Sequence, residues 1–406
     1  MVDPLDVMMN KECVVPYFLP ILSADKQLVI GYEVVARWQE GKRMSKLGWF
    51  FEDRSIPGEY RLEVEDYLQE VALARYIESR QQGVLYFNYD AKLLTKDGGE
   101  TLIERLRLCE AEGVSLRRLI IGIKGGDMSE EVGSLKHTVM YLQSLGVQIA
   151  VDVDSPSTSQ LDNLAILKPN VIRVNVSFLE ETSLPALYRD VHQPMSMLAR
   201  KIGATLLFDG LETFTQLNYA WRSGGRYYQG PYLQKAGPAF VERELCKPKL
   251  QKDMHHFIHY ERQKVAAQLV LSNDLTQKLR QALKTIDAED TYDQMIVNIA
   301  RTLDAYTFRV YICNEDGFQQ SSNAEKGRDG TWELYQEGRY KNWSWRPYFL
   351  ENIARMNVEK KGILSDLYSD IERDEHIRTY SYPLTDTLYV FIDIPYEYLF
   401  EQNGLL

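Results

Sequence analysis

One segment, residues 147–178, restricts the possible fold more than any other part of the chain. It begins with an apolar, β-rich run at 147–151, continues through a Ser/Pro/Thr loop and a short amphipathic stretch, and ends in a second β-rich run at 171–176. A strand, a helix and a strand in this order form a βαβ unit, whose two strands lie parallel. Neither run alternates cleanly between apolar and polar residues, which is typical of strands covered on both faces. The segment therefore predicts an α/β protein.

Asp152 stands where the first of these strands meets its loop. Chemistry in α/β barrels and in open α/β sheets gathers at the C-terminal ends of the strands. A carboxylate at this point is therefore a candidate for a functional site. An acidic N-cap of the following helix accounts for the same residue equally well, so the pattern by itself leaves both interpretations open.

The same alternation of strands and helices extends over most of the first half of the chain. Strands are expected at 17–21, 28–37, 84–88, 119–124, 147–151, 171–176, 205–208 and 226–229, and helices at 58–82, 99–112, 129–145, 184–202 and 213–222. Roughly eight strand-and-helix steps in about 240 residues are the size of one (βα)8 barrel. An open doubly wound sheet is the alternative, because strands counted along one sequence do not show whether a sheet closes.

A long helix and then a different pattern follow the predicted barrel. Residues 248–286 carry apolar side chains at helical spacing, which predicts a spacer, a dimer-forming helix, or a helix that lies back along the barrel. A further helix at 290–304 precedes β-rich segments, the first of them an expected hairpin at 307–323. A helix before a mostly antiparallel sheet is typical of a small α+β domain. The expected divisions of the chain are 1–245, 246–286 and 287–406.

Composition excludes several classes of protein. A net charge of −11 argues against a protein that binds nucleic-acid polymers. The four cysteines are far apart and have neither disulfide-framework nor zinc-ligand spacing, which favours the reducing cytoplasm. The first residues lack the basic flank and apolar core of a signal peptide. No apolar run approaches the roughly 20 residues that span a bilayer, so we expect a cytoplasmic protein without a membrane partner.

Polar residues at the predicted strand ends form an ordered series. They are Glu33 in GYEVVARW, Asn88 in VLYFNYD, Asp152 in IAVDVDS, Arg173 in IRVNVSF, Asp209 and Glu212 in LLFDGLET, and Gln229 in YYQGPYL. In this order and spacing they resemble the EAL domain, the cyclic di-GMP phosphodiesterase module. The resemblance covers about residues 15–235. It implies an α/β fold, an EAL-type (βα)8 TIM-like barrel, usually a homodimer, with cyclic di-GMP bound across the barrel mouth.

The departures from the EAL pattern concern its metal centre. The resemblance implies that Glu33, Asn88 and Asp152 are remnants of the ligands of two divalent ions, which generate a hydroxide and neutralise the phosphate. Gly122 stands where the pattern has a glutamate, and Val153 stands where it has the second aspartate of a pair. With both carboxylates lost, we expect no two-metal centre and no cofactor, with Mg²⁺ or Mn²⁺ required only if residual activity exists.

The catalytic and nucleotide-binding positions are only partly retained. Arg173 occupies the position of the catalytic lysine, and a guanidinium stays protonated and cannot act as a base. Asp209 replaces a longer glutamate, and Leu19 replaces a glutamine that faces the nucleotide in the family. No catalytic set is therefore expected intact. The residues that the resemblance assigns to the nucleotide are Arg37, which would contact a phosphate, and Asp209, Glu212 and Gln229.

A positive side chain is a candidate replacement for the missing metal ions. Lys124 lies on the same strand face as Gly122 by alternation, and we hypothesise that its ammonium pairs with Glu33 or Asp152. The alternative is a solvated lysine beyond the strand end, which is its more common environment. Asp154 shares a face with Asp152 and offers a replacement acid if the strand extends that far.

The aromatic-rich part of the C-terminal region resembles PAS-like sensor domains of the Cache type. The segments that carry the resemblance are WRPYFLENI, GILSDLYSD and TYSYPL. The resemblance implies that Arg346, with Trp345 and Tyr348, holds the carboxylate of a small ligand and that Asp366 holds its amine. An aromatic core with a structural Arg–Asp pair is the alternative, because clustered aromatic residues usually form core.

These observations lead to a first expected function and two alternatives. The first is a catalytically degenerate EAL signalling protein, which acts as a cyclic di-GMP receptor or dimeric scaffold with a small-molecule-sensing C-terminal domain and a protein partner that the sequence does not name. The second is a residual cyclic di-GMP phosphodiesterase that produces linear pGpG. The third is a scaffold that no longer binds the nucleotide, because a fold does not fix a function.

Overall fold

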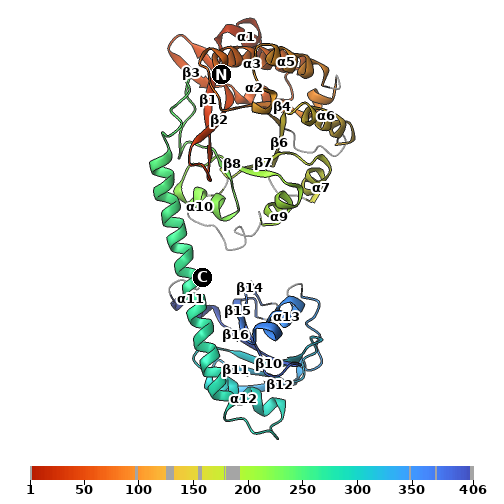
Figure 1. Cartoon of the computed structure of the whole chain (residues 1–406), viewed down its shortest axis with the longest axis vertical. Coiled ribbons are helices and arrows are strands. Elements are labelled where there is room, and N and C mark those ends of the chain that lie inside the picture. Colours follow the sequence, from red (N-terminus) through yellow and green to blue (C-terminus); the bar gives the residue numbers. More distant parts are fainter. Residues whose placement is uncertain are drawn as a thin grey trace. The chain divides into compact units, whose positions relative to one another are not determined.

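The computed structural model of the chain describes residues 2–96, 99–124, 132–153, 158–177, 179, 193–346, 349–370 and 373–402. The chain forms two compact units, Met1–His255 and His256–Leu406, and each is considered by itself (Figure 1). The beginnings of the helices expected at 129–145 and 184–202 lie outside the described residues. No helix in the described ranges combines the length and the apolar character needed to cross a membrane.

The first unit is a closed barrel. Its strands are β1 (Val14–Ser23), β2 (Val29–Glu40), β4 (Val84–Asp90), β5 (Leu119–Lys124), β6 (Gln148–Val153), β7 (Val171–Asn175), β8 (Thr205–Asp209) and β9 (Tyr227–Tyr228). They pair in the order β1-β9-β8-β7-β6-β5-β4-β2, and the additional pairing of β1 with β2 closes the ring, while β3 (Arg43–Lys46) extends β2. The predicted barrel is confirmed, and the open doubly wound sheet is wrong.

The first strand departs from a strict alternation of strands and helices. β1 runs antiparallel to both of its neighbours, β2 and β9, whereas the pairs from β2 through β9 are parallel. The turn between β1 and β2 explains the difference, because a parallel crossover needs about a dozen residues and this connection is much shorter. The antiparallel register places Leu19 opposite Glu33.

Helices surround the barrel on its outer side (Figure 1). They are α1 (Pro4–Met9), α2 (Gly48–Glu52), α3 (Gly58–Glu78), α4 (Ala91–Lys96), α5 (Glu100–Ala111), α6 (Val132–Ser144), α7 (Thr158–Leu167), α9 (Gln193–Ile202) and α10 (Phe214–Arg222), with short 3₁₀ turns at Lys11–Cys13 and Leu116–Arg118. Helix α3 buries Val64, Leu68 and Ala72 at helical spacing. A capping box of Thr213 and Gln216 begins α10 directly after the loop that leaves β8.

Helix α11 (Lys247–Leu283) is one uninterrupted helix of 37 residues. Its buried residues fall into two groups, because Leu250 and Phe257 are buried near its start, whereas Leu275 and Leu279 are buried near its end. The later group belongs to the hydrophobic core of the second unit. The end of α11 is therefore a core helix of the C-terminal unit and not a solvated spacer.

The second unit is a mostly antiparallel sheet with helices against it. Its elements are α12 (Tyr292–Thr302), β10 (Arg309–Asn314), β11 (Asn323–Lys326), β12 (Trp332–Tyr335), a 3₁₀ turn (Gln336–Gly338), α13 (Phe349–Glu359), β13 (Ile363–Leu364), β14 (Tyr368–Ser369), β15 (His376–Pro383), β16 (Leu388–Ile394) and α14 (Tyr396–Glu401). The strand order is β12-β11-β10-β16-β15-β13, with β14 paired to β15. This is the expected small α+β architecture.

One element of the expected hairpin is misplaced. The prediction put its second strand at 318–323, where Gln319 forms a single antiparallel bridge with Cys313, but the continuous strand that pairs with β10 begins only at Asn323. Local side-chain hydrogen bonds explain the difference, because the Ser321 hydroxyl accepts from the Ile312 backbone N–H at 2.9 Å and the Gln319 amide donates to the Ser321 carbonyl at 3.0 Å. Such bonds compete with a regular strand ladder.

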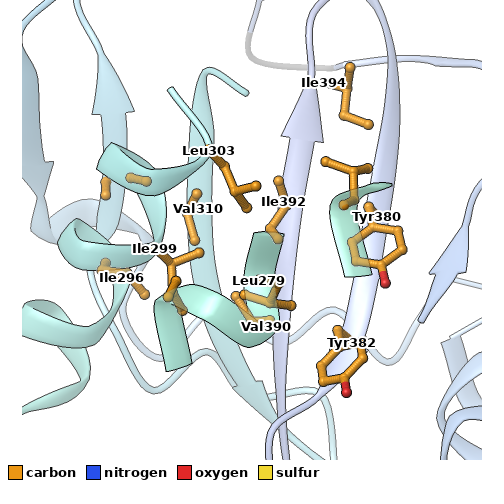
Figure 2. Packing of buried hydrophobic residues seen from close by; sticks show 14 of the residues in the cluster. Leu279, Ile296, Ile299, Leu303, Val310, Tyr380, Tyr382, Val390, Ile392 and Ile394 are labelled. Carbon is orange, nitrogen blue, oxygen red and sulfur yellow. The ribbon is translucent and has the colours of Figure 1, made fainter. Parts of the chain in front are cut away.

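The core of the second unit lies between α11, α12 and the sheet. Figure 2 shows Ile296 and Ile299 of α12, and Leu303 directly after this helix, facing Val310 of β10, with Leu279 of α11 close by. Each of these side chains has no exposed surface. The packing predicts which apolar residues of α11 contribute to stability.

Replacing Leu279 by alanine is expected to lower the free energy of unfolding of the second unit by about 2–5 kcal/mol, because it leaves a cavity in this core. Leu269→Ala is the matched control on the same helix, since Leu269 is 61% exposed and its truncation removes little buried surface. Denaturant unfolding of both variants measures the difference. Equal stability of the two variants would contradict the core role of the end of α11.

Candidate functional site

Five of the predicted strand-end residues meet inside the mouth of the barrel. Each comes from a different strand: Asn88 on β4, Asp152 on β6, Arg173 on β7 and Asp209 on β8 lie in the C-terminal halves of their strands, and Glu33 is the last residue of β2 that pairs with β4. Parallel pairing aligns these positions, because Asp152 is the register partner of Arg173 and Asn175 that of Asp209. The barrel thus assembles one cluster from residues far apart in the sequence.

The guanidinium of Arg173 is the centre of this cluster. Its Nη1 and Nη2 donate to Oε1 and Oε2 of Glu33 at 3.0 and 3.1 Å, which is a bidentate ion pair. Nη2 also donates to Oδ2 of Asp209 at 2.6 Å, and Nη1 donates to Oδ1 of Asn88 at 3.3 Å. Oδ2 of Asp152 lies 3.6 Å from Nη1. One side-chain cation therefore engages all four of the other residues.

Glu33 receives two more hydrogen bonds from its neighbours. The Asn88 amide donates to its Oε1 at 2.8 Å, and the Gln229 amide donates to its Oε2 at 2.5 Å. Glu33 is 2% exposed and Gln229 is 1% exposed. A buried carboxylate needs partners for its lone pairs, and here both oxygens have them. Gln229 thus has a structural role in addition to the one predicted from the resemblance.

Tyr86 fills the space of the carboxylate that the sequence lacks at Gly122. A Cβ atom added to Gly122 would overlap the phenol group of Tyr86. The Tyr86 hydroxyl donates to Oδ1 of Asp152 at 3.2 Å, and the Arg173 guanidinium lies 5.5 Å from its ring centroid. Alternation along the strand puts Tyr86 on the same face as Asn88, and the structure pairs Asn88 with Gly122.

Burial and the close charges change the pKa values of the cluster. Burial alone would lower the pKa of Arg173, but the carboxylates of Asp209, Glu33 and Asp152 raise it well above its usual value. Burial raises the pKa of the Asp152 carboxyl, although Arg173 and Lys124 oppose the change. Burial, with the charge of Asp152, also raises the pKa of the Tyr86 hydroxyl well above its ordinary range. Arg173 is therefore a permanent cation.

Lys124 does not hold the place proposed for it. Lys124 is the last residue of β5 and pairs in register with Asp90 of β4. In the ion pairs of the described residues, Glu33 and Asp152 are both paired with Arg173. The charge of Lys124 still acts on Asp152 through space. The cation that contacts these acids directly is Arg173. Asp154 lies outside the described residues.

Two of the predicted nucleotide-binding residues stand apart from the cluster. The Glu212 side chain is exposed in the loop after β8, where its backbone N–H donates to Oε1 of Gln216 at 2.6 Å. Arg37 is half-buried, lies 5.6 Å from the centroid of the Tyr17 ring, and donates to the Ala36 carbonyl at 3.3 Å. Their contacts with a nucleotide stay predictions.

The donor set does not fit a pair of divalent ions. The acids of the cluster are turned toward a guanidinium, and Tyr86 occupies the space next to Gly122. In the parts of the chain that the structure describes, no group of three or more His, Cys, Asp or Glu side chains is placed to hold a metal ion. Divalent cations need several convergent oxygens, and here Arg173 stands among them.

The second unit has a small cavity where one of the predicted ligand residues lies. Arg346 lines this cavity, with its guanidinium 4.5 Å from the centroid of the Trp343 ring. Trp345 is 64% exposed and does not line it, and Asp366 is exposed and does not line it either. Tyr348 lies outside the described residues.

The buried Arg–Asp cluster of this unit uses other residues. Arg309 donates to Oδ2 of Asp393 at 2.7 Å and to Oδ2 of Asp370 at 2.9 Å, and all three are buried. Oδ1 of Asp393 accepts from the Thr379 hydroxyl at 2.6 Å. Sequence analysis missed this group, because a strand pattern does not show which charged residues of different strands meet.

Comparison with known families and proteins agrees with the architecture. The EAL domain model matches residues 5–236, and a model described as an EAL-domain associated signalling protein domain matches residues 240–406. The chain is 41% identical to the uncharacterised EAL-domain protein YkuI of Bacillus subtilis, over the full length of both chains. It is 25% identical to the probable cyclic di-GMP phosphodiesterase PdeD of Escherichia coli, over 52% of this chain and 39% of that protein.

Solved structures show the same fold. The crystal structure of Bacillus subtilis YkuI, in complex with its substrate c-di-GMP and calcium, has a TM-score of 0.92 with this chain and covers all of both chains. An EAL-domain protein of Listeria monocytogenes, 17% identical, has a TM-score of 0.50 over 58% of this chain and 94% of that one. The EAL domain model covers more than half of the chain, and YkuI is related to it over its full length at 41% identity. The chain belongs to the EAL-domain family.

Proposed function

We propose that this chain is a catalytically degenerate EAL signalling protein that binds cyclic di-GMP without hydrolysing it. The observation that supports this most strongly is the position of the Arg173 guanidinium, which is bonded to Glu33, Asn88 and Asp209. These oxygens are the ones that would otherwise be available to a metal ion. A cation that belongs to the chain cannot be exchanged or removed.

The same residue argues against hydrolysis. The EAL reaction uses metal ions to generate a hydroxide and to neutralise charge on the phosphate. Arg173 supplies positive charge, but a guanidinium held protonated by three acids cannot accept a proton from water. Tyr86 cannot take the role of a base either, because its pKa is raised well above the ordinary range. Neither Arg173 nor Tyr86 therefore supplies a base that generates the nucleophile.

Binding of the nucleotide is supported by the relatives and by the retained residues. YkuI, with the same architecture throughout, was crystallised with c-di-GMP. Arg37 and Glu212 occupy family positions for nucleotide contacts and are not consumed by the Arg173 cluster. We further propose a cytoplasmic homodimer, in which the C-terminal unit acts as a PAS-like sensor of a small molecule. A scaffold that has lost the nucleotide is the competing function.

Calorimetric titration of the full chain with cyclic di-GMP, in EDTA and in excess Mn²⁺, tests the proposal. We expect the same dissociation constant in both buffers, because the fixed cation replaces the exchangeable ions, and no linear dinucleotide by chromatography in either. Arg37→Gln is expected to weaken binding roughly 10- to 100-fold through loss of a charged hydrogen bond. Arg43→Gln, an exposed residue on β3, is the matched control.

Two outcomes would contradict the proposal in different ways. Chelator-sensitive production of linear pGpG by the wild-type chain would establish the residual phosphodiesterase. Absence of binding in both buffers would leave the scaffold that no longer recognises the nucleotide.

A further inference from the structure

The hairpin of β2 and β3 places two cations directly opposite each other. Arg37 of β2 and Lys46, the last residue of β3, are register partners in this antiparallel pair. Opposite residues of such a pair lie on one face of the sheet, with their Cβ atoms about 5 Å apart, and like charges in this position are destabilising. The chain has a net charge of −11, so the facing cations do not follow from a basic composition. Their repulsion needs a compensating anion.

The two cations share a face with the residues of the barrel mouth. Side chains alternate along a strand, so Arg37 lies on the same face of β2 as Glu33, which contacts Arg173 inside the barrel. We call this side of the hairpin the mouth face. Arg37 follows Glu33 by four residues toward the C-terminal end of the strand, which is roughly 13 Å at about 3.3 Å per residue. The pair therefore stands at the rim, beyond the Arg173 cluster.

Arg37 is half-buried without an acid to neutralise it. Among the described residues its guanidinium donates to the carbonyl of its own neighbour Ala36 at 3.3 Å and lies 5.6 Å from the centroid of the Tyr17 ring. Burial lowers the pKa of Arg37, and the opposing influence is Tyr17 and not a carboxylate. A guanidinium has five N–H donors, so most of them are left for solvent or a ligand. An anion bound here would offset the cost of burying the charge.

Lys46 also lacks an acid partner. The ion pairs that lysines form among the described residues do not include it, and its side chain is exposed. Glu40 is the one acid between Arg37 and Lys46 in the sequence. It is the register partner of Arg43, and alternation puts both of them on the face opposite the mouth face. The hairpin thus separates its charges, with two cations on the mouth face and an acid beside a base on the other.

We propose that Lys46 binds the nucleotide together with Arg37, so that the two cations hold one phosphodiester group of the cyclic dinucleotide between them. The guanidinium offers paired donors to two phosphate oxygens, and the ammonium adds a point charge on the other side of the group. The inference rests on the proposed binding of cyclic di-GMP and names a residue that sets its affinity. The family resemblance assigned no role to Lys46, because the residue belongs to none of the strand-end motifs.

Calorimetric titration of full-length variants with cyclic di-GMP tests the role of Lys46. Lys46→Gln is expected to bind roughly 5- to 20-fold more weakly than the wild-type chain, because a contact to a charged group is lost at an exposed position. The difference is expected to shrink at high salt, which screens exposed charges. Lys46→Arg keeps the charge and is expected to retain most of the affinity.

Lys46→Glu separates a ligand contact from a structural role. It is expected to weaken binding more than Lys46→Gln does, because it repels the phosphate. It also places an acid opposite Arg37, so we expect a Tm equal to or above that of the wild-type chain, since opposite charges across a strand pair are favourable. A residue that only supported the hairpin would lose stability and binding together.

Arg43→Gln is the matched control, because Arg43 lies on the same strand β3 but on the face opposite the mouth face. It is expected to bind cyclic di-GMP as the wild-type chain does. Equimolar sodium phosphate is expected not to displace the nucleotide, and displacement would indicate a site for a free phosphate ion instead. Unchanged binding by folded Lys46→Gln, or a lowered Tm of Lys46→Glu, would overturn the role of Lys46 and leave the proposed function in place. Absence of nucleotide binding by the wild-type chain would overturn both.

Discussion

Replacing Arg173 by methionine is expected to lower the free energy of unfolding of the first unit by about 3–5 kcal/mol, the cost of removing one partner from a buried ion pair. The substitution leaves Glu33 and Asp209 without their cation in a water-poor site. Denaturant unfolding measures the change. The matched control is Arg226→Met, which removes the exposed pair with Asp25 and is expected to cost about 1 kcal/mol or less.

A second substitution and a metal titration identify the cause of this loss. Asp209→Asn in the Arg173→Met background is expected to recover part of the stability, because it removes one of the unpaired acids and the two positions are in contact. Mn²⁺ is expected to raise the Tm of Arg173→Met and to leave that of the wild-type chain unchanged, since the variant frees the acid oxygens. An equal Mn²⁺ response of both proteins would show that the guanidinium does not exclude the ion.

Restoring the missing acid alone is expected to fail. Gly122→Glu places a side chain where the Tyr86 phenol lies, and we expect a loss of several kcal/mol or no folded protein, from overpacking and from the added buried charge. Thermal unfolding and the yield of soluble protein measure this. Gly133→Glu is the matched control, because Gly133 is exposed on α6 and has open space around it.

The double variant Gly122→Glu/Tyr86→Ala is expected to be more stable than Gly122→Glu alone. The smaller alanine makes room for the carboxylate, and Arg173 is close enough to pair with it. The coupling between the two positions is measured by a double-mutant cycle. A well-folded Gly122→Glu single variant that gains Mn²⁺-dependent hydrolysis would contradict both the steric argument and the proposed role of Arg173.

In the proposed function, the guanidinium of Arg173 stands where exchangeable cations would otherwise bind. Two divalent ions can be withdrawn by a chelator and supply a nucleophile, whereas a guanidinium does neither. Two structural features support this proposal, the long side chain at position 173 and the ring of Tyr86 over Gly122. Removal of the Arg173 guanidinium alone therefore leaves Glu33 and Asp209 unpaired. A side chain added at Gly122 alone overlaps the phenol of Tyr86.

The alternation of strands and helices predicted an α/β protein but left an open sheet as an alternative. The order of the strand-end residues, through its resemblance to the EAL family, predicted the barrel and the residues at its mouth. Local sequence carries this information, because side chains alternate along a strand and the ends of parallel strands meet at one face. The loss of acids at Gly122 and Val153 was also visible without coordinates. The antiparallel direction of β1 and the late start of β11 were not visible in the sequence. The turn between β1 and β2 decided the first, and the local hydrogen bonds of Gln319 and Ser321 decided the second.

By itself the sequence indicated an EAL barrel in which Gly122 and Val153 stand where the family pattern has acids, because motif order and residue type are properties of the chain. Only the tertiary structure decided that Arg173, and not Lys124, pairs with Glu33 and Asp152, and that Tyr86 covers Gly122. The bond between Arg173 and Glu33 joins residues 140 positions apart, and that between Gln229 and Glu33 joins residues 196 positions apart. Which side chain reaches an acid across a barrel depends on its length and on the curvature of the sheet, which neighbours in sequence do not encode.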